Sequence, residues 1–305
     1  MSPYIIEANH ITKRYAGHTA LEDVSFQIPV GKIFGMLGPN GAGKTTMIRI
    51  INQIIAPDEG ELKFFGEKLL PKHIESIGYL PEERGLYKKM KVGEQALYLA
   101  QLKGLKKADA KEKLKFWFDK FEMNGWWNKK VEELSKGMQQ KVQFVTTILH
   151  EPQLLILDEP FTGFDPINAN LVKDEILALK NKGTSIIIST HRMESVEELC
   201  DNIALIHQSK KVLGGSVKDI RKQHKTDIYE VKILHAKESF IPYLMEGYEV
   251  LLTSNDEEET TYQIKVVRGS VNELIQLASR VGEVHGFKEL VPSMNDIFIQ
   301  TVQNN

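Results

Sequence analysis

The sequence predicts an α/β protein with a mixed, mostly parallel central sheet, followed by a small α+β domain. Two continuous apolar runs of strand length, at residues 154–157 and 185–189, are separated by a helix-length segment, as buried parallel strands are. A glycine-rich loop at residues 38–46 joins a third apolar run to a segment with helical spacing. Beyond residue 226, short segments alternate apolar and polar residues, which is typical of half-exposed strands.

The first 80 residues predict an antiparallel start to this fold. Strand-like segments at 4–8 and 24–28 flank a turn at residues 16–17. The apolar run at 33–37 enters the glycine-rich loop, and the helical pattern after the loop stops before Pro57. We therefore expect a helix at 47–54 and short strands at 62–65 and 77–80.

Residues 89–150 predict a helical subdomain. The Lys-rich stretch at 103–115 is interpreted as a solvated face. We expect helices at 92–103, 108–121 and 136–149. The aromatic side chains are expected to pack within the subdomain rather than to form a stacking surface; they are Phe116, Trp117, Phe118, Phe121, Trp126 and Trp127.

The rest of the chain completes a first domain at residues 1–220 and adds a second at 227–305. The single cysteine, Cys200, cannot form an internal disulfide and is predicted to be a buried structural thiol on a helix at 193–200. The basic segment 221–226 is interpreted as a linker. Further expected elements are a helix at 167–182, a strand at 202–207 and a turn at 214–215, then strands at 228–234, 248–253, 261–267 and 285–291 and helices at 270–281 and 294–302.

The composition excludes some partners. A net charge of −2 and a pI near 6.5 argue against direct binding of nucleic acid, because its binders carry a concentrated basic surface. No run approaches the ~20 apolar residues that cross a bilayer, and the N-terminus lacks a signal-peptide pattern. We therefore expect a soluble cytoplasmic protein that reaches a membrane only through another polypeptide.

The loop at residues 38–46 predicts a site for a magnesium nucleoside triphosphate. In the spacing G-x-x-x-x-G-K-T, glycines let backbone N–H groups turn toward an anion, and the following helix contributes its positive end. Lys44 suits the terminal phosphates and Thr45 a magnesium ion. The alternative, a glycine turn without a ligand, fits the strand–loop–helix context less well. The predicted nucleotide-binding residues are Gly38, Pro39, Asn40, Gly41, Ala42, Gly43, Lys44, Thr45 and Thr46.

Three polar residues after buried strands predict the chemistry of hydrolysis. Asp158 and Glu159 end the run at 154–157, where Asp158 suits a magnesium ion and Glu159 the attacking water. His191 follows the next apolar run and is predicted to contact the terminal phosphate and support Glu159. The alternative for each is an ordinary polar residue at a strand end.

Ser135 and Gly137 open the helix expected at 136–149 and predict a second anion site. The alternative is an ordinary serine N-cap, which the local sequence favours by itself. One triphosphate hardly needs two helix N-termini from separate parts of the chain.

Together these motifs resemble the ATP-binding subunits of ABC transporters over about residues 3–220. In that family, residues 38–46 match the Walker A loop, 154–159 the Walker B strand, 134–140 the signature motif and His191 the switch histidine. The resemblance implies that Tyr15 stacks on adenine and that Asp165 lies in the D-loop beside the nucleotide. It also implies that Glu82 takes the place of the Q-loop glutamine near magnesium.

The family pairs head to tail around two ATP molecules, so the resemblance implies a second ATP-binding subunit, here a second copy of the chain. Ser135 and Gly137 of one copy would then face the phosphates bound by Lys44 of the other. A separate membrane-spanning subunit is also implied, with this chain at the cytoplasmic face. Lys136, Met138 and Glu82 depart from the usual family residues, which predicts altered charge at the dimer seam and an altered magnesium dependence.

The interpretation is an ATP-hydrolysing motor subunit with ATP and Mg²⁺ as cofactors. The segments 80–87 and 292–298 are similar to those of sodium-efflux (Nat-type) and drug-resistance exporters. Alternatives are a soluble ATPase of the same type acting on nucleic acid or ribosomes, and a regulator that senses ATP without hydrolysing it.

Overall fold

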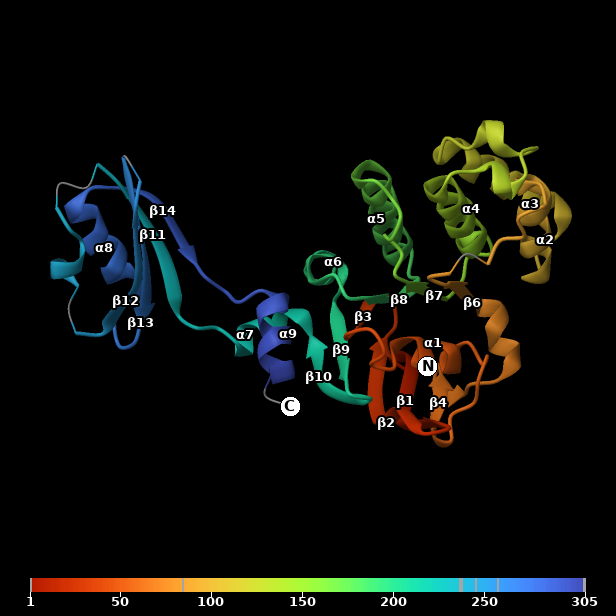
Figure 1. The fold of residues 1–305 in the computed structure, drawn as a ribbon, viewed down its shortest axis with the longest axis horizontal. Helices are drawn as coiled ribbons and strands as arrows, with labels where there is room; N and C mark the ends of the chain where they lie inside the picture. Colours follow the sequence, from red (N-terminus) through yellow and green to blue (C-terminus); the bar gives the residue numbers. More distant parts are fainter. Residues whose placement is uncertain (1, 84, 236–237, 245, 257, 304–305) are drawn as a thin grey trace. The chain divides into compact units, whose positions relative to one another are not determined.

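The computed structural model describes residues 2–83, 85–235, 238–244, 246–256 and 258–303, which form two compact units (Figure 1). The first unit reaches Val217 and also includes the last described residues from Thr301, and the second covers Lys218–Gln300. We expected the first domain to reach residue 220 and the second to begin at 227.

The central sheet of the first unit holds the strands that the apolar runs predicted. Its order is β10-β9-β3-β8-β7-β6, with parallel pairing from β9 to β6 and β10 antiparallel at one edge. In register, Leu37 lies level with Thr190, and Asp158 with Ser189, so polar residues meet at one edge of the sheet. The strands are β3 (Ile33–Leu37), β6 (Ile77–Leu80), β7 (Leu154–Asp158), β8 (Ser185–Thr190), β9 (Asn202–His207) and β10 (Lys210–Ser216).

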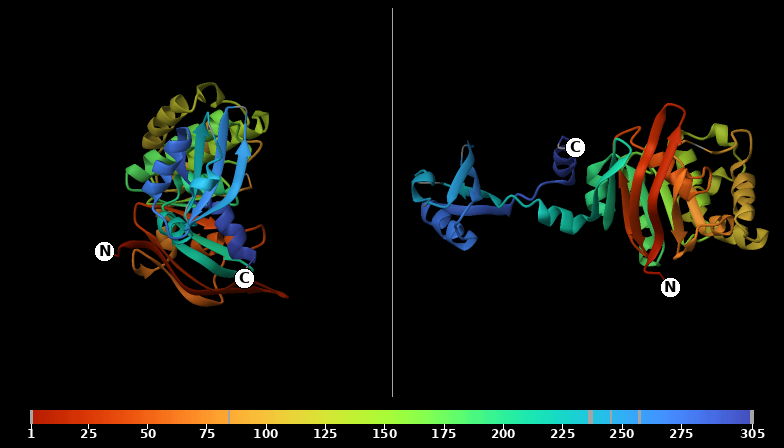
Figure 2. Two further views of the ribbon diagram at one scale, coloured as in Figure 1. Left: turned by 90° about the vertical axis from the view of Figure 1, so that its left-hand side faces the viewer. Right: turned by 90° about the horizontal axis from the view of Figure 1, so that it is seen from below.

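A second, antiparallel sheet has the order β2-β1-β4-β5. Its hairpin of β1 (Tyr4–Tyr15) and β2 (His18–Pro29) is longer than the sequence predicted (Figure 2). The left-handed residues His10 and Asp23 interrupt the period-two pattern that would have revealed the full strands. The remaining members are β4 (Glu59–Phe64) and β5 (Glu67–Lys68), and α1 (Lys44–Ile51) shares one apolar core with both sheets.

Residues 92–148 hold three helices, and several of their aromatic side chains pack against one another. Phe121 lies 5.8 Å from Phe144 and Phe118 5.6 Å from Trp127, measured between ring centroids. Phe116 is the exception, since it is 60% exposed. The helices here are α2 (Val92–Leu102), α3 (Lys107–Lys120) and α4 (Lys136–Ile148), with short 3₁₀ turns at Asn124–Trp126 and Val131–Glu133.

The other helices of the first unit connect or cover the central strands. Within the described residues, no helix of the chain is both long and apolar enough to cross a membrane. Cys200 is buried as predicted, and its burial raises the pKa of the thiol to about 12. The helices that connect or cover the central strands are α5 (Pro166–Asn181), α6 (Met193–Leu199) and the 3₁₀ segment Pro71–Ser76.

The second unit is an antiparallel sheet covered on one face by α8 (Val271–Val281). Leu274, Leu277, Ala278 and Val281 recur at helical spacing and pack on the sheet. The strand order is β12-β13-β11-β14. The other elements of this unit are β11 (Ile228–Leu234), β12 (Tyr248–Asn255), β13 (Glu259–Val266), β14 (Glu283–Glu289) and a 3₁₀ turn at Ile241–Tyr243. The last helix, α9 (Met294–Gln303), begins in this unit, and its residues from Thr301 on belong to the first unit.

Two expectations about the end of the first unit were wrong. Residues 214–215 lie inside β10, because Gly214 and Gly215 pair with Ala204 and Ile203 and continue the ladder. The segment 221–226 is not only a linker, since α7 (Val217–Gln223) extends into it. Val217 and Ile220 lie three residues apart on this helix, and both are buried. The basic residues that follow them made the segment look like a linker in the sequence.

Candidate active site

A cleft of about 370 Å³ opens where the glycine-rich loop meets the ends of the central strands. This size is in the range of small-ligand sites. Two of its lining residues, His18 and Ala20, were not predicted. The lining residues are Tyr15, His18, Ala20, Asn40, Gly41, Gly43, Lys44, Thr45, Thr46, Glu82, Asp158 and Glu159.

Two glycines of the loop are required by its backbone. Gly38 has a φ of 147°, and a Cβ on it would lie 2.1 Å from the carbonyl oxygen of Ile206. Gly43 has a φ of 113°, and a Cβ there would lie 2.3 Å from the carbonyl oxygen of Ala20. Only glycine fits both the left-handed backbone and the close approach of a neighbouring strand. Gly38, Pro39 and Ala42 belong to the same loop but do not line the cleft, and neither does His191.

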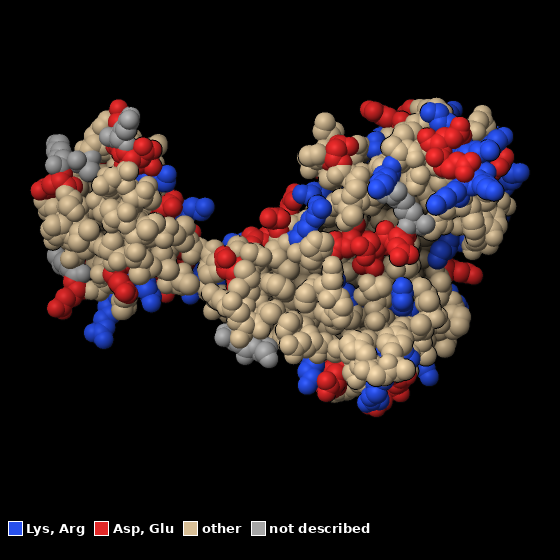
Figure 3. All heavy atoms as spheres, viewed as in Figure 1, with Lys and Arg blue, Asp and Glu red and all other residues tan. Residues whose placement is uncertain are grey.

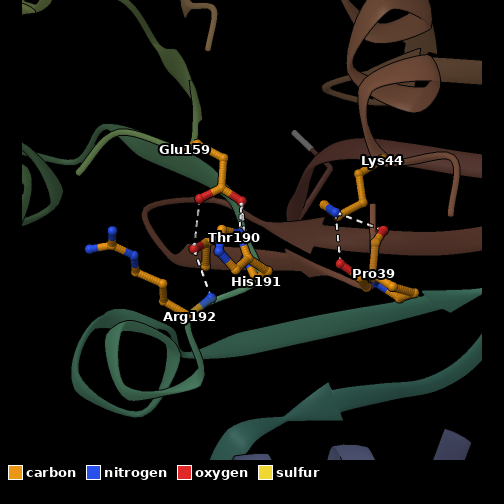
Figure 4. Close-up of polar contacts among 7 residues, drawn as sticks. Pro39, Lys44, Glu159, Thr190, His191 and Arg192 are labelled. Carbon is orange, nitrogen blue, oxygen red and sulfur yellow. Dashed lines mark hydrogen bonds and ion pairs between the residues drawn. The ribbon is translucent and has the colours of Figure 1, made fainter. Parts of the chain in front are cut away.

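Lys44 starts α1 and is buried beneath the loop. Its Nζ donates hydrogen bonds to the carbonyl oxygens of Gly38, at 2.7 Å, and Pro39, at 3.1 Å (Figure 4). Burial lowers the pKa of Lys44, while Glu159, Asp158 and Glu82 oppose that shift. The ammonium group is therefore held against the loop, close to where phosphates would lie.

The cleft carries a concentration of carboxylates. Burial raises the pKa of Asp158. The negative charges of Glu82 and Glu159 add to this shift, and the positive charge of Lys44 opposes it. Figure 3 shows acidic side chains gathered on this face, where β6, β7 and β8 end below α4 and α5. The Thr45 hydroxyl and the carboxylates of Glu82, Asp158 and Glu159 all line this cleft, and oxygen atoms are the ligands that Mg²⁺ prefers.

Glu159 follows β7 and has both carboxylate oxygens held (Figure 4). Oε1 accepts from the backbone N–H of His191 at 3.1 Å and lies 2.7 Å from its Nδ1. Oε2 accepts from the Thr190 hydroxyl at 3.2 Å. A φ of 49° puts the backbone of Glu159 in the left-handed region, which costs energy in a non-glycine residue. The fold thus brings His191 and Glu159 into direct contact.

Ser135, Gly137 and Asp165 lie outside the cleft. Ser135 is exposed and caps α4, because its Oγ accepts from the Met138 N–H at 3.3 Å. Asp165 caps α5 by accepting from the Asn168 N–H at 3.0 Å. A Cβ on Gly137 would lie 3.6 Å from the carbonyl oxygen of Gly163, so these two helix starts are neighbours. Within one copy they do not complete the Lys44 site.

Sequence reasoning missed three residues of this region. His18 lies directly opposite Tyr15 across the β1–β2 turn, so the hairpin register could have pointed to it. Ala20 enters the lining from the same strand and carries no chemical signal. Thr190 is buried next to His191, and only its contact with Glu159 distinguishes it from an ordinary strand residue.

Comparison with known proteins defines the class. Residues 21–162 match the family model described as ABC transporter, and residues 215–302 match the C-terminal domain of ATP-binding proteins like DrrA1-3. The chain therefore belongs to the ATP-binding proteins of ABC transporters, and its first unit is an ATPase domain. The family match confirms the predicted fold class.

Two relatives and one solved structure show how similar this chain is to particular members of that class. The chain is 39% identical to YhaQ of Bacillus subtilis, an uncharacterized ABC transporter ATP-binding protein, over 98% of both chains. It is 34% identical to the ABC transporter ATP-binding protein NatA of the same organism, over 68% of this chain and 86% of NatA. A solved ATP-binding subunit of an ABC transporter superposes with a TM-score of 0.68 at 31% identity, covering 72% of this chain and 92% of that one.

Proposed function

We propose that this ATPase subunit binds MgATP in the cleft and uses Glu159 as the general base for hydrolysis, to drive export through a separate membrane subunit. The observation that carries the proposal is one cleft holding the Lys44 ammonium group, the buried Asp158 and an anchored Glu159 carboxylate. Thr45, Asp158 and Glu82 are the residues that would hold Mg²⁺, which offsets the charge of the phosphates when bound. Tyr15 would stack on the adenine.

The reaction follows from these groups. A water oxygen forms a bond to the γ-phosphorus, and the bond from that phosphorus to the β–γ bridging oxygen breaks. Glu159 takes a proton from the attacking water, and ADP and inorganic phosphate leave. Lys44 and the loop N–H groups bind the phosphate oxygens, and His191 orients Glu159 and contacts the γ-phosphate.

A second copy of the chain completes the site in this proposal. Ser135, Gly137 and Asp165 are outside the Lys44 cleft of their own copy, and Ser135 lies at a helix N-terminus suited to an anion. Bound ATP would then join two copies, and hydrolysis would release them. ATP-driven closure of this kind supplies the movement that a transporter needs.

Export is supported by several relatives. NatA, the linearmycin resistance protein LnrL and the bacitracin transport protein BcrA are 34%, 32% and 31% identical to this chain. A groove of about 300 Å³ lies beside the 80–87 segment, where Tyr79, Leu86 and Leu99 offer apolar contacts to a membrane subunit. Sodium or a drug is the class of substrate proposed. The net charge of −2 gives no support to a nucleic-acid partner.

The test is an ATPase assay on the purified chain, together with its purification from detergent-solubilised native membranes. We expect magnesium-dependent hydrolysis and a membrane-spanning protein that co-purifies and stimulates it. Binding of ATP without hydrolysis would indicate a sensing regulator instead. Co-purification with ribosomes alone would indicate a soluble ATPase.

Replacing Glu82 tests its part in the magnesium site. Glu82→Gln removes one of the carboxylates of the cleft, so we expect hydrolysis to persist but to need roughly threefold more magnesium. The measurement is a magnesium titration of the ATPase rate at fixed ATP. Glu83→Gln is the matched control, because Glu83 is exposed and does not line the cleft. Identical titrations of Glu82→Gln and the unaltered protein would remove Glu82 from the site.

A further inference from the structure

Thr190 is buried at the end of β8, between the glycine-rich loop and Glu159. It pairs in register with Leu37, the last residue before the loop. Its neighbour Ser189 pairs with Asp158 and accepts a hydrogen bond from the Glu159 N–H at 2.9 Å. Thr190 therefore occupies a rigid, central position from which its side chain reaches the carboxylate of Glu159.

The Thr190 hydroxyl donates one hydrogen bond and accepts another. Oγ1 donates to Glu159 Oε2 at 3.2 Å and accepts from the Arg192 N–H at 3.0 Å (Figure 4). Because the N–H of Arg192 occupies an acceptor position of the oxygen, the hydroxyl proton is directed to the carboxylate. Hydrogen bonds to a charged group are the stronger kind, and they fix direction as well as distance.

The two oxygens of Glu159 differ in what holds them. Oε2 is held by the hydroxyl of Thr190, which is 1% exposed. Oε1 accepts from the backbone N–H of His191 and also lies 2.7 Å from its Nδ1, on a side chain that is 56% exposed. If the exposed imidazole turns toward a phosphate, Oε1 keeps its backbone partner and Oε2 keeps the Thr190 hydroxyl.

The geometry points to Thr190 as a positioning residue for hydrolysis. We infer that its hydroxyl anchors Oε2 and so presents Oε1 as the oxygen that takes the proton from the attacking water. This inference rests on the proposed function, in which Glu159 is the general base. It adds that His191 can leave Glu159 during the reaction cycle without the carboxylate losing its orientation.

The test compares three substitutions of the full-length chain by their kcat and KM for ATP. Thr190→Val keeps the shape and the strand preference but removes the hydroxyl, and we expect kcat to fall about 10- to 100-fold. KM for ATP should change by less than about threefold, because Thr190 is not among the residues that line the cleft. Thr190→Ser keeps the hydroxyl and should recover most of kcat. Thr12→Val is the control, since Thr12 is 4% exposed in β1 and its hydroxyl accepts a hydrogen bond from the backbone N–H of Asp23.

A double substitution separates positioning from a merely structural role. In a Glu159→Gln background the base is gone, so adding Thr190→Val should change the residual rate by less than about twofold. The inference is overturned if Thr190→Val has the same kcat as the unaltered protein, or if Thr12→Val lowers kcat as much as Thr190→Val does. It is also overturned if Thr190→Val lowers the residual rate of Glu159→Gln by the full factor seen in the unaltered protein. Unaltered turnover of Glu159→Gln alone overturns the proposed function instead, which keeps the two failures distinct.

Discussion

Glu159→Gln is expected to retain ATP binding while its turnover falls by about 10²- to 10⁴-fold, the range typical for loss of a general base. The amide keeps the size of the side chain and can still accept the bond from the His191 N–H, so the cleft should keep its shape. The amide cannot take a proton from water. The measurements are the steady-state ATPase rate and the dissociation constant of a fluorescent ATP analogue.

The same substitution should trap two copies around uncleaved ATP. Size-exclusion chromatography with MgATP is expected to show a dimer for Glu159→Gln and a monomer when ATP is left out. Glu151→Gln is a matched control, because its side chain is 77% exposed and it does not line the cleft. A turnover of Glu159→Gln within twofold of the unaltered protein would show that another group acts as the base.

Gly38→Ala is expected to abolish nucleotide binding and to lower the free energy of unfolding of the first unit by about 3 kcal/mol or more. The new Cβ would lie 2.1 Å from the carbonyl oxygen of Ile206, which belongs to the neighbouring strand β9 and cannot move without breaking the sheet. The backbone at a φ of 147° adds strain for any residue with a Cβ.

Urea denaturation followed by tryptophan fluorescence measures this effect, because all three tryptophans lie in the first unit, at Trp117, Trp126 and Trp127. Gly41→Ala is the control: its φ is 80°, but a Cβ there meets nothing within 4 Å, so we expect a cost of roughly 1 kcal/mol from backbone strain alone. Equal losses for the two variants would mean that the contact with Ile206 carries no cost.

Much of the first unit could be predicted because its signals are local. The central strands are continuous apolar runs, and the helices of the subdomain have clear apolar periodicity. The longer extent of β1 and β2 was missed because left-handed residues break the alternation along each strand. The turn at 214–215 and the linker at 221–226 were wrong for one reason: glycines and basic residues usually mark breaks, but here strand pairing and two buried apolar residues override them.

The sequence by itself determined the strand, loop and helix around residues 38–46, and that Asp158, Glu159 and His191 stand at the ends of buried strands, because these features depend on residue types at a fixed local spacing. It also offered a helix cap as the alternative to an anion site at Ser135, and the cap is a local contact. Only the tertiary structure decided that the Thr190 hydroxyl also holds Glu159, from 31 residues away along the chain. It likewise decided that Gly38 must pass against Ile206. These depend on the parallel register of neighbouring strands, which arises from packing the whole sheet.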